Sequence, residues 1–330
     1  MRKQAIFDVA VNGSSIAAVL DPILTSISVS DQAGTHGDTA NIELDDAGGQ
    51  IAMPKPGAKI TVSLGWIGAG LREVFSGTVD EVRSVGSRGG GMTLSIMAKG
   101  FDTTGKAKEG QERHFDDKTV EEIANSAASP AGLKVEVDPQ IASIVIPYIE
   151  MRGESLLHFG QRLARMVGAS FRVQGERAVI ARRASDYTPE VTAARDVNLH
   201  SWDITPFIGR TRYKKAKAKY YDKATGKTET VETTVDPNAL TDAEFYRREL
   251  AADKPSAERA VKADAAVINE KGGAGSVTIE GAPDAVPDGL CRLVGARPGI
   301  DGAYRIKGVT HSLTRGGGYT TTLDLAHPEK

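Results

Sequence analysis

Short runs of alternating apolar and polar residues dominate the first hundred residues. A period of two places every second side chain on the same face, so each run predicts a half-buried strand. Turn residues such as Asn12-Gly13 separate the runs, and the whole chain holds 36 glycines. The alternating apolar positions are Phe7, Val9 and Val11, Ile27 and Val29, Ile42 and Leu44, and Ile60, Val62 and Leu64. We therefore expect an antiparallel barrel or sandwich over residues 1–105.

A helical period replaces the alternation in the middle of the chain. Thr119 and Glu122 have the spacing of a capping box, which predicts a helix over about residues 119–128. A second helix is expected over about residues 154–167, where apolar residues recur at helical spacing. That apolar stripe consists of Leu156, Phe159, Leu163 and Val167. A hairpin with glycine in its loop should follow over residues 169–182, which makes residues 106–186 a small α+β module.

Strands return after about Thr188, with an interruption. Thr241 and Glu244 have the spacing of a second capping box, and an Ala-rich run follows. We expect residues 187–330 to form a second β-barrel with a helical insertion at about residues 241–271.

Two distant segments of the chain resemble each other. Residues 79–98 and 306–326 both contain a strand, an Arg-Gly-Gly-Gly turn and a second strand. With Arg88 aligned to Arg315, Val79 falls on Ile306, Val82 on Val309, Thr93 on Thr320 and Ile96 on Leu323. Glycine-rich hairpins can resemble one another by chance, but the alternative is a chain with two related β-barrels. The expected fold class is therefore mainly β (α+β), with two related antiparallel barrels and the small helix and hairpin module.

Composition narrows the class of protein. The formal net charge of -2 argues against a surface built entirely to hold nucleic acid. Cys291 is the only cysteine, so the sequence offers no intrachain disulfide and no Cys-rich zinc module, and a reducing compartment fits best. No run of about 18 consecutive apolar residues occurs, which predicts no membrane-spanning helix.

Side chains that could carry chemistry are scattered. The six histidines include no pair at helical metal-binding spacing, and no serine lies in a nucleophile-elbow context. His158 lies at the flank of the apolar stripe, which favours a boundary position over a catalytic one. Adjacent acids such as Asp45 and Asp46 point to opposite faces of a strand and rarely form a two-carboxylate site. We expect no catalytic site, no metal site and no cofactor, although the sequence leaves open a triad assembled from distant residues.

A basic run over residues 209–227 is the strongest charge feature. Its cationic members before residue 220 are Arg210, Arg212, Lys214, Lys215, Lys217 and Lys219. Lysines that alternate with Ala216 and Ala218 should project from one face of a strand. Such a row can protect a strand edge or form a solvated face. It can also line a channel for nucleic acid or contact an acidic partner, and charge alone does not choose between these interpretations.

The segment GESLLHFGQRLARMVGASFRV, residues 153–173, resembles a motif of phage late-control D proteins and of the hub portion of VgrG proteins. The residues that carry the resemblance are Glu154, Ser155, Phe159, Arg162, Leu163, Ala164, Gly168 and Phe171. Other similar pieces follow the family's order at residues 31–46, 56–65, 220–226 and 302–326. The similarity therefore covers nearly the whole chain.

The resemblance implies the baseplate hub of a contractile tail or a related particle, without enzymatic activity. Such a hub would be a homotrimer that joins a sixfold tail tube protein to a threefold central spike protein, beside other baseplate proteins. It would lie in the virion tail baseplate after assembly in the host bacterial cytoplasm, and DNA could pass through its ring. VgrG proteins usually continue into a long spike, whereas this chain stops at Lys330, so we expect the spike to be a separate polypeptide.

Three other functions stay open from the sequence. A tail-associated cell-wall-degrading enzyme would need a carboxylate pair in a cleft, which the sequence does not display. A VgrG-type secretion component would share the hub fold. A nucleic-acid-binding β protein would use the basic run and bind in a salt-dependent manner.

Overall fold

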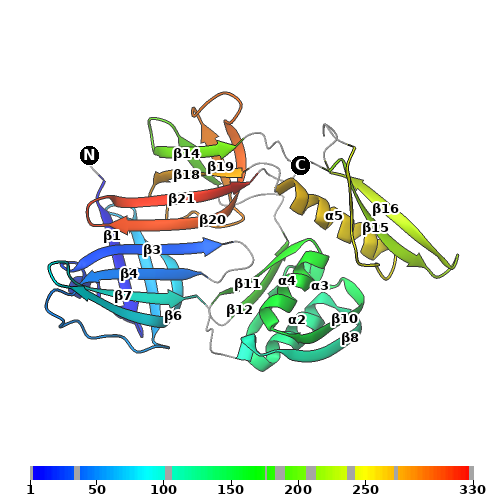
Figure 1. Cartoon of the computed structure of the whole chain (residues 1–330), viewed down its shortest axis with the longest axis horizontal. Coiled ribbons are helices and arrows are strands. Elements are labelled where there is room, and N and C mark those ends of the chain that lie inside the picture. The colour runs from blue at the N-terminus through cyan, green and yellow to red at the C-terminus, as the bar shows by residue number, and fades with distance from the viewer. Residues whose placement is uncertain are drawn as a thin grey trace.

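The computed structural model describes residues 3–32, 38–100, 106–174, 177–182, 190–205, 213–235, 242–270 and 274–326. Its largest element is a thirteen-stranded sheet in which all pairings but one are antiparallel. Figure 1 shows strands from both ends of the chain side by side in this sheet. A mainly β fold with a large antiparallel sheet is therefore confirmed, while the closure of two barrels stays a prediction.

The N-terminal part of the chain contributes seven strands and one short helix, α1 (Ala17–Leu20). The strands are β1 (Ala5–Val11), β2 (Ser14–Ser15), β3 (Leu24–Gln32), β4 (Thr39–Asp45), β5 (Lys59–Trp66), β6 (Gly70–Ser87) and β7 (Gly91–Lys99). The C-terminal part contributes β13 (Glu190–Ala194), β14 (Leu199–Thr205), β18 (Ala274–Glu280), β19 (Leu290–Val294), β20 (Gly302–Thr314) and β21 (Gly318–Ala326). Along the sheet the order is β14-β18-β21-β20-β3-β4-β7-β6-β5-β1-β2, with β19 beside β20 and β13 beside β19.

The two Arg-Gly-Gly-Gly hairpins have the same strand register. Val79 pairs with Ala98 in the first hairpin, and the aligned residues Ile306 and Leu325 pair in the second. A β-bulge follows Val79 in one and Ile306 in the other, so even the irregularity is repeated. The similarity seen in the sequence therefore extends to the backbone of both hairpins.

The two strands beside each hairpin, β3 and β4 in one case and β14 and β18 in the other, also repeat, although their sequences do not show it. Strand β3 pairs with β4 through Leu24 opposite Leu44 and Ile27 opposite Ile42. Strand β14 pairs with β18 in the same register, and both pairs have a bulge directly after their first contact. We call β3, β4, β7 and β6 the first set, and β14, β18, β21 and β20 the second set. Each set is one copy of the same four-stranded arrangement.

An arm interrupts the second set between β14 and β18. It comprises β15 (Lys215–Asp222), β16 (Lys227–Thr234), β17 (Glu244–Tyr246) and α5 (Lys254–Glu270), and Figure 1 shows it extending away from the large sheet. The helical insertion expected at about residues 241–271 is wrong in its first part, because Glu244 lies in a strand and Thr241 lies outside the described residues. The helix instead begins after Asp253, whose carboxylate accepts a hydrogen bond from the backbone N–H of Ser256 at 2.8 Å. Pro255 fits this start because the first helical turn leaves its N–H groups unpaired.

The α+β module lies between the two sets along the chain. Its elements are η1 (Lys106–Lys108), β8 (Gln111–Thr119), α2 (Val120–Ala128), η2 (Ser129–Ala131), β9 (Lys134–Val137), α3 (Pro139–Ala142), β10 (Val145–Glu154), α4 (Leu156–Met166), β11 (Ala169–Gln174) and β12 (Arg177–Arg182). Both expected helices and the expected hairpin are present within two residues of their predicted bounds. Thr119 and Glu122 form the capping box that the sequence predicted.

In the described parts of the chain, buried apolar side chains form four clusters. One surrounds each set and includes neighbouring strands, one lies in the module and one lies in the arm. The cluster of the first set includes Leu313 and Tyr319, which come from the second set. The two sets therefore share part of a core. The division of the chain at residues 105 and 186 stays a prediction.

Candidate functional site

The residues that carry the family resemblance hold the start of α4 in place. Ser155 caps the helix by accepting a hydrogen bond from the backbone N–H of His158 at 3.4 Å. The Arg162 guanidinium binds the Glu154 carboxylate and donates to the Glu150 carbonyl oxygen, which ties α4 to strand β10. His158 is exposed. These contacts fit a structural role for the motif.

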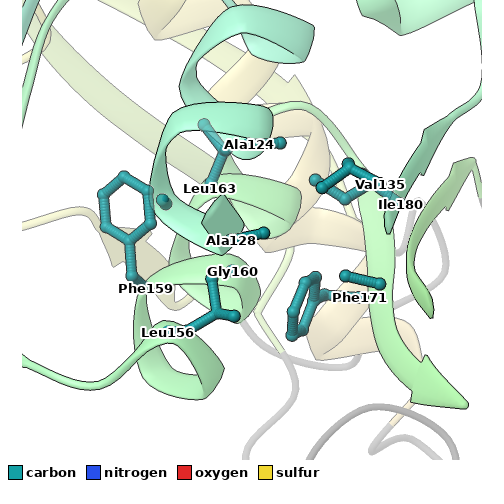
Figure 2. A pocket seen from close by; sticks show the side chains of 11 residues that line it. Ala124, Ala128, Val135, Leu156, Phe159, Gly160, Leu163, Phe171 and Ile180 are labelled. Carbon is teal, nitrogen blue, oxygen red and sulfur yellow. The ribbon is translucent and has the colours of Figure 1, made fainter. Parts of the chain in front are cut away.

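The apolar face of α4 packs inside the module. Phe159 and Leu163 are fully buried, and Gly168 turns the chain with a φ of 70°. A small cavity lies between α2, α4 and strands β9, β11 and β12, as Figure 2 shows. All eleven residues that line it are apolar, and the rings of Phe159 and Phe171 lie on opposite sides of it. This cavity offers a ligand no polar group for orientation.

The basic run lies on the arm. Arg210 and Arg212 fall outside the described residues. Lys215, Lys217 and Lys219 lie on β15 as predicted, with their alternating neighbours Ala216 and Ala218 buried against α5. The lysine row therefore occupies the face of β15 opposite the helix.

Acidic residues of neighbouring strands accompany this row. Lys217 Nζ lies 2.7 Å from Glu244 and 3.5 Å from Glu232, and Lys215 also binds Glu232. Lys214 Nζ lies 2.9 Å from Asp242. Hydrogen bonding to lysine lowers the pKa of Glu232 and of Glu244, and hydrogen bonding to Glu244 raises the pKa of Lys217. The described part of the run is thus a surface of mixed charge.

A cluster of charged residues joins the module to both sets. Asp288, before β19, accepts a hydrogen bond from Arg172 of β11 at 3.1 Å and another from Arg305 of β20 at 3.0 Å. Arg305 is 3% exposed, so its charge is compensated inside the protein. Asp31 on β3 and Asp38 before β4 belong to the same cluster, since Arg172 acts on both carboxyls.

Burial raises the pKa of both carboxyls in this pair. Burial raises the pKa of Asp38 to about 8, and the neighbouring Asp31 carboxyl adds to the rise through its charge and a hydrogen bond. The pKa of Asp31 is also raised by burial, and the Arg172 guanidinium opposes that rise. A protonated carboxyl that is hydrogen-bonded to a second carboxyl can link two parts of a structure. Some enzymes use such a pair in acid catalysis.

Side chains also tie the N-terminal part of the sheet to its C-terminal part. Trp66 Nε1 donates a hydrogen bond to the Gly281 carbonyl oxygen at 2.8 Å, and the Trp66 ring lies 5.5 Å from that of Tyr319. Within the second set, His311 is buried with Nδ1 3.0 Å from the Tyr319 hydroxyl, and burial lowers the His311 pKa to about 4. An uncharged His311 fits this packed position. Lys3 with Glu280, and Arg72 with Asp284, add ion pairs between the same two parts of the sheet.

The family model described as "Phage tail baseplate hub (GPD)" matches residues 39–317. The chain belongs to the phage tail baseplate hub family. A probable baseplate hub protein of Escherichia phage 186 is 27% identical to this hub over 97% of the chain and 92% of the relative. A second one, from Escherichia phage P2, is 32% identical over 55% of the chain and 48% of the relative.

Solved structures share the hub's fold. A 43 kDa tail protein of prophage MuSo2 from Shewanella oneidensis has a TM-score of 0.75 at 17% identity, covering 98% of the hub and 99% of that chain. A tail protein from Neisseria meningitidis MC58 has the same TM-score at 15% identity, covering 98% and 97%. A type VI secretion component from E. coli reaches 0.61 at 12% identity, covering 93% and 74%.

The charged cluster of the hub is the feature that sequence reasoning missed. Asp31, Asp38, Arg172, Asp288 and Arg305 come from three regions that only the fold brings together. A weak signal was available at Asp288, because an aspartate before glycine in a turn can adopt the positive φ of 66° seen here. Within the described residues, no group of three or more His, Cys, Asp or Glu side chains is placed to hold a metal ion. In the same part of the chain, no helix is long and apolar enough to cross a membrane.

Asp288→Asn is expected to destabilise the hub, because the buried Arg305 then loses its carboxylate partner. Asn keeps the tolerance for the positive φ, so the change reports on charge. We expect a loss on the order of 3 kcal/mol in the free energy of unfolding, measured by urea denaturation. Asp284→Asn is the matched control, since Asp284 is 65% exposed and its ion pair with Arg72 should contribute less than about 1 kcal/mol. Equal effects of the two substitutions would contradict a structural role for the cluster.

The raised pKa of Asp38 predicts a pH dependence of stability. A carboxyl whose pKa is higher in the folded state contributes stability below its unfolded pKa of about 4, and that contribution fades as the pH rises to about 8. Asp38→Asn should therefore become more stable relative to the wild type as the pH rises, by at most about 1.4 kcal/mol per pH unit. Urea denaturation at pH 5 and pH 8 measures the difference. A constant difference between the two proteins across this range would show that Asp38 does not hold the proton.

Proposed function

We propose that this hub is a structural homotrimer that joins a sixfold tail tube to a threefold central spike and catalyses no reaction. The observation that carries the proposal is the repetition of one four-stranded arrangement, in the same register, as the first and second sets. Three chains with two sets each would present six similar units to the tube. The chains themselves would keep the threefold symmetry that a spike requires.

The proposed partners are the tail tube protein, the central spike protein and other baseplate proteins, in the virion tail baseplate after assembly in the host bacterial cytoplasm. DNA would pass through the ring. The basic run would line this channel or contact a neighbouring subunit. Because acids compensate Lys214, Lys215 and Lys217, ion pairs with another subunit suit the described part of the run better than a bare positive channel wall.

Trimer formation is the first expected outcome. Light scattering of the purified hub over a range of concentrations should give the mass of three chains, and the trimer should bind purified tail tube protein. A hub that stays monomeric at every concentration, with and without tube and spike proteins, would contradict the proposal. A trimer that binds a type VI tube protein in place of a phage tube protein would assign it to a secretion device of the VgrG type.

A cell-wall-degrading enzyme is the second candidate function. The observation that favours it is the hydrogen-bonded carboxyl pair of Asp31 and Asp38, in which burial raises the pKa of Asp38 to about 8. A zymogram with purified cell wall separates the two functions. We expect no clearing from the wild type or from Asp38→Asn, since the carboxyl pair is bound up with Arg172 at a junction of structural elements. Clearing by the wild type that Asp38→Asn abolishes would establish the enzyme.

A further inference from the structure

The sheet of the arm exposes apolar side chains on the side away from α5. We call this side of β15, β16 and β17 the arm face. Tyr221 and Tyr246 lie on it and are 46% and 52% exposed, and Leu250, shortly after β17, is 58% exposed. Single exposed apolar residues are common on protein surfaces, but two tyrosines and a leucine close together on one small sheet are typical of an interface.

Positive charge exceeds negative charge on the arm face. Its charged side chains are those of Lys215, Lys217, Lys219, Glu232 and Glu244. The two glutamates bind Lys215 and Lys217, which leaves Lys219 without an ion-pair partner among the described residues. Lys223 and Lys227, in and after the hairpin turn, are also exposed and extend the positive charge past the end of β15. The arm face therefore suits an acidic partner surface.

An acidic surface with similar apolar residues lies on the module. We call the outer side of the paired strands β8 and β10 the module face. Val145 and Tyr148 of β10 are 50% and 51% exposed on it. Asp116 pairs with Tyr148, and both Asp116 and Asp117 are exposed. The outward positions around them belong to Glu112, His114, Glu150 and Arg152. Acids therefore outnumber bases on the module face, which makes it opposite in charge to the arm face.

The two faces of one chain point in different directions. Within a chain the arm contacts the module through α5 and α4, whereas the arm face lies on the side of its sheet opposite α5. Strands β8 and β10 lie at the outer side of the module in Figure 1, beyond α2 and α4. Contact between the two faces therefore requires two chains. It would cover the exposed tyrosines and bring unpaired lysines to unpaired carboxylates.

We propose that the arm face of one hub chain docks on the module face of a second hub chain, with Lys219 and the lysines of the turn facing Asp116 and Asp117. The contact is heterologous, because each chain contributes a different surface and keeps the other surface for the next chain. Three such contacts can close a ring. This inference deepens the proposed trimer and rests on it.

Carbodiimide cross-linking tests the contact in the unaltered hub. The reagent activates a carboxylate and joins it to a nearby lysine amine as an amide, while the carbodiimide leaves as its urea. Trimers reassembled from nitrogen-15-labelled and unlabelled chains should give mixed-label peptides that link Lys219, Lys223 or Lys227 to Asp116 or Asp117, detected by mass spectrometry. Lys217 and Glu244, whose charged atoms lie 2.7 Å apart, are the positive control and should link only within one chain. Lys262, exposed on α5, is the negative control and should not link to either aspartate.

Charge reversal provides a second measurement. Lys219→Glu with Lys227→Glu would place acids opposite acids and should raise the dissociation constant of the trimer by about tenfold or more. Adding Glu112→Lys and Asp116→Lys to the same chain restores opposite charges and should recover most of this loss. Lys254→Glu with Lys262→Glu, a matched pair on α5, should leave the trimer unchanged. Light scattering over a range of concentrations measures all four proteins, and circular dichroism checks that each is folded.

The results separate this contact from the proposed trimer. A trimer that gives no mixed-label link between the two faces overturns the contact and leaves the proposed trimer standing, with the arm face open to another tail protein. A hub that stays monomeric overturns both. A folded variant with all four substitutions that assembles no better than Lys219→Glu with Lys227→Glu also overturns the contact. If that variant does not fold, the cross-links of the unaltered hub decide.

Discussion

Strand β3 belongs to the first set and strand β20 to the second, and their antiparallel pairing makes one sheet from two copies of the same arrangement. The backbone hydrogen bonds fix the direction and register of this contact, while side chains make it specific. Leu313 and Tyr319 enter the core of the first set, and Trp66 bonds back to Gly281. Because the junction is both buried and hydrogen-bonded, the two sets are held in one fixed relation. The proposed role, in which the hub joins a sixfold tube to a threefold spike, requires the two sets to be held rigidly.

The module and the charged cluster depend on the same junction. Arg172 reaches from β11 to Asp288, which also binds the buried Arg305 of β20. Asp31 lies on β3, the strand that makes the junction, and its carboxyl is hydrogen-bonded to Asp38, whose pKa is raised by burial. The cluster thus links the module to both sets where they meet. The arm stands apart from it, with its own small core between β15 and α5.

Local patterns predicted local structure well in this chain. The Arg-Gly-Gly-Gly hairpins, the capping box at Thr119 and the stripe of α4 each depend on residues close in sequence, and all three are present. The second capping box failed at Glu244, because strand pairing with β15 overrode the local helical preference. The sequence does not show that β14 repeats β3. The arm separates β14 from its partner β18 along the chain, and the equivalent residues Ile27 and Trp202 differ in size and chemistry. The charged cluster could not be predicted, since its members lie far apart in the chain.

The proposed function depends on the two sets of each chain holding equivalent positions around the axis of an assembled ring. A cryo-electron microscopy map of the purified hub trimer tests it most directly, through the rotation that relates each set to the next around the axis. The account predicts six sets at nearly equal rotations of about 60°, with the steps inside and between chains alike. Two sets that lie at different radii or tilts, or a step between chains unlike the step inside a chain, would contradict it.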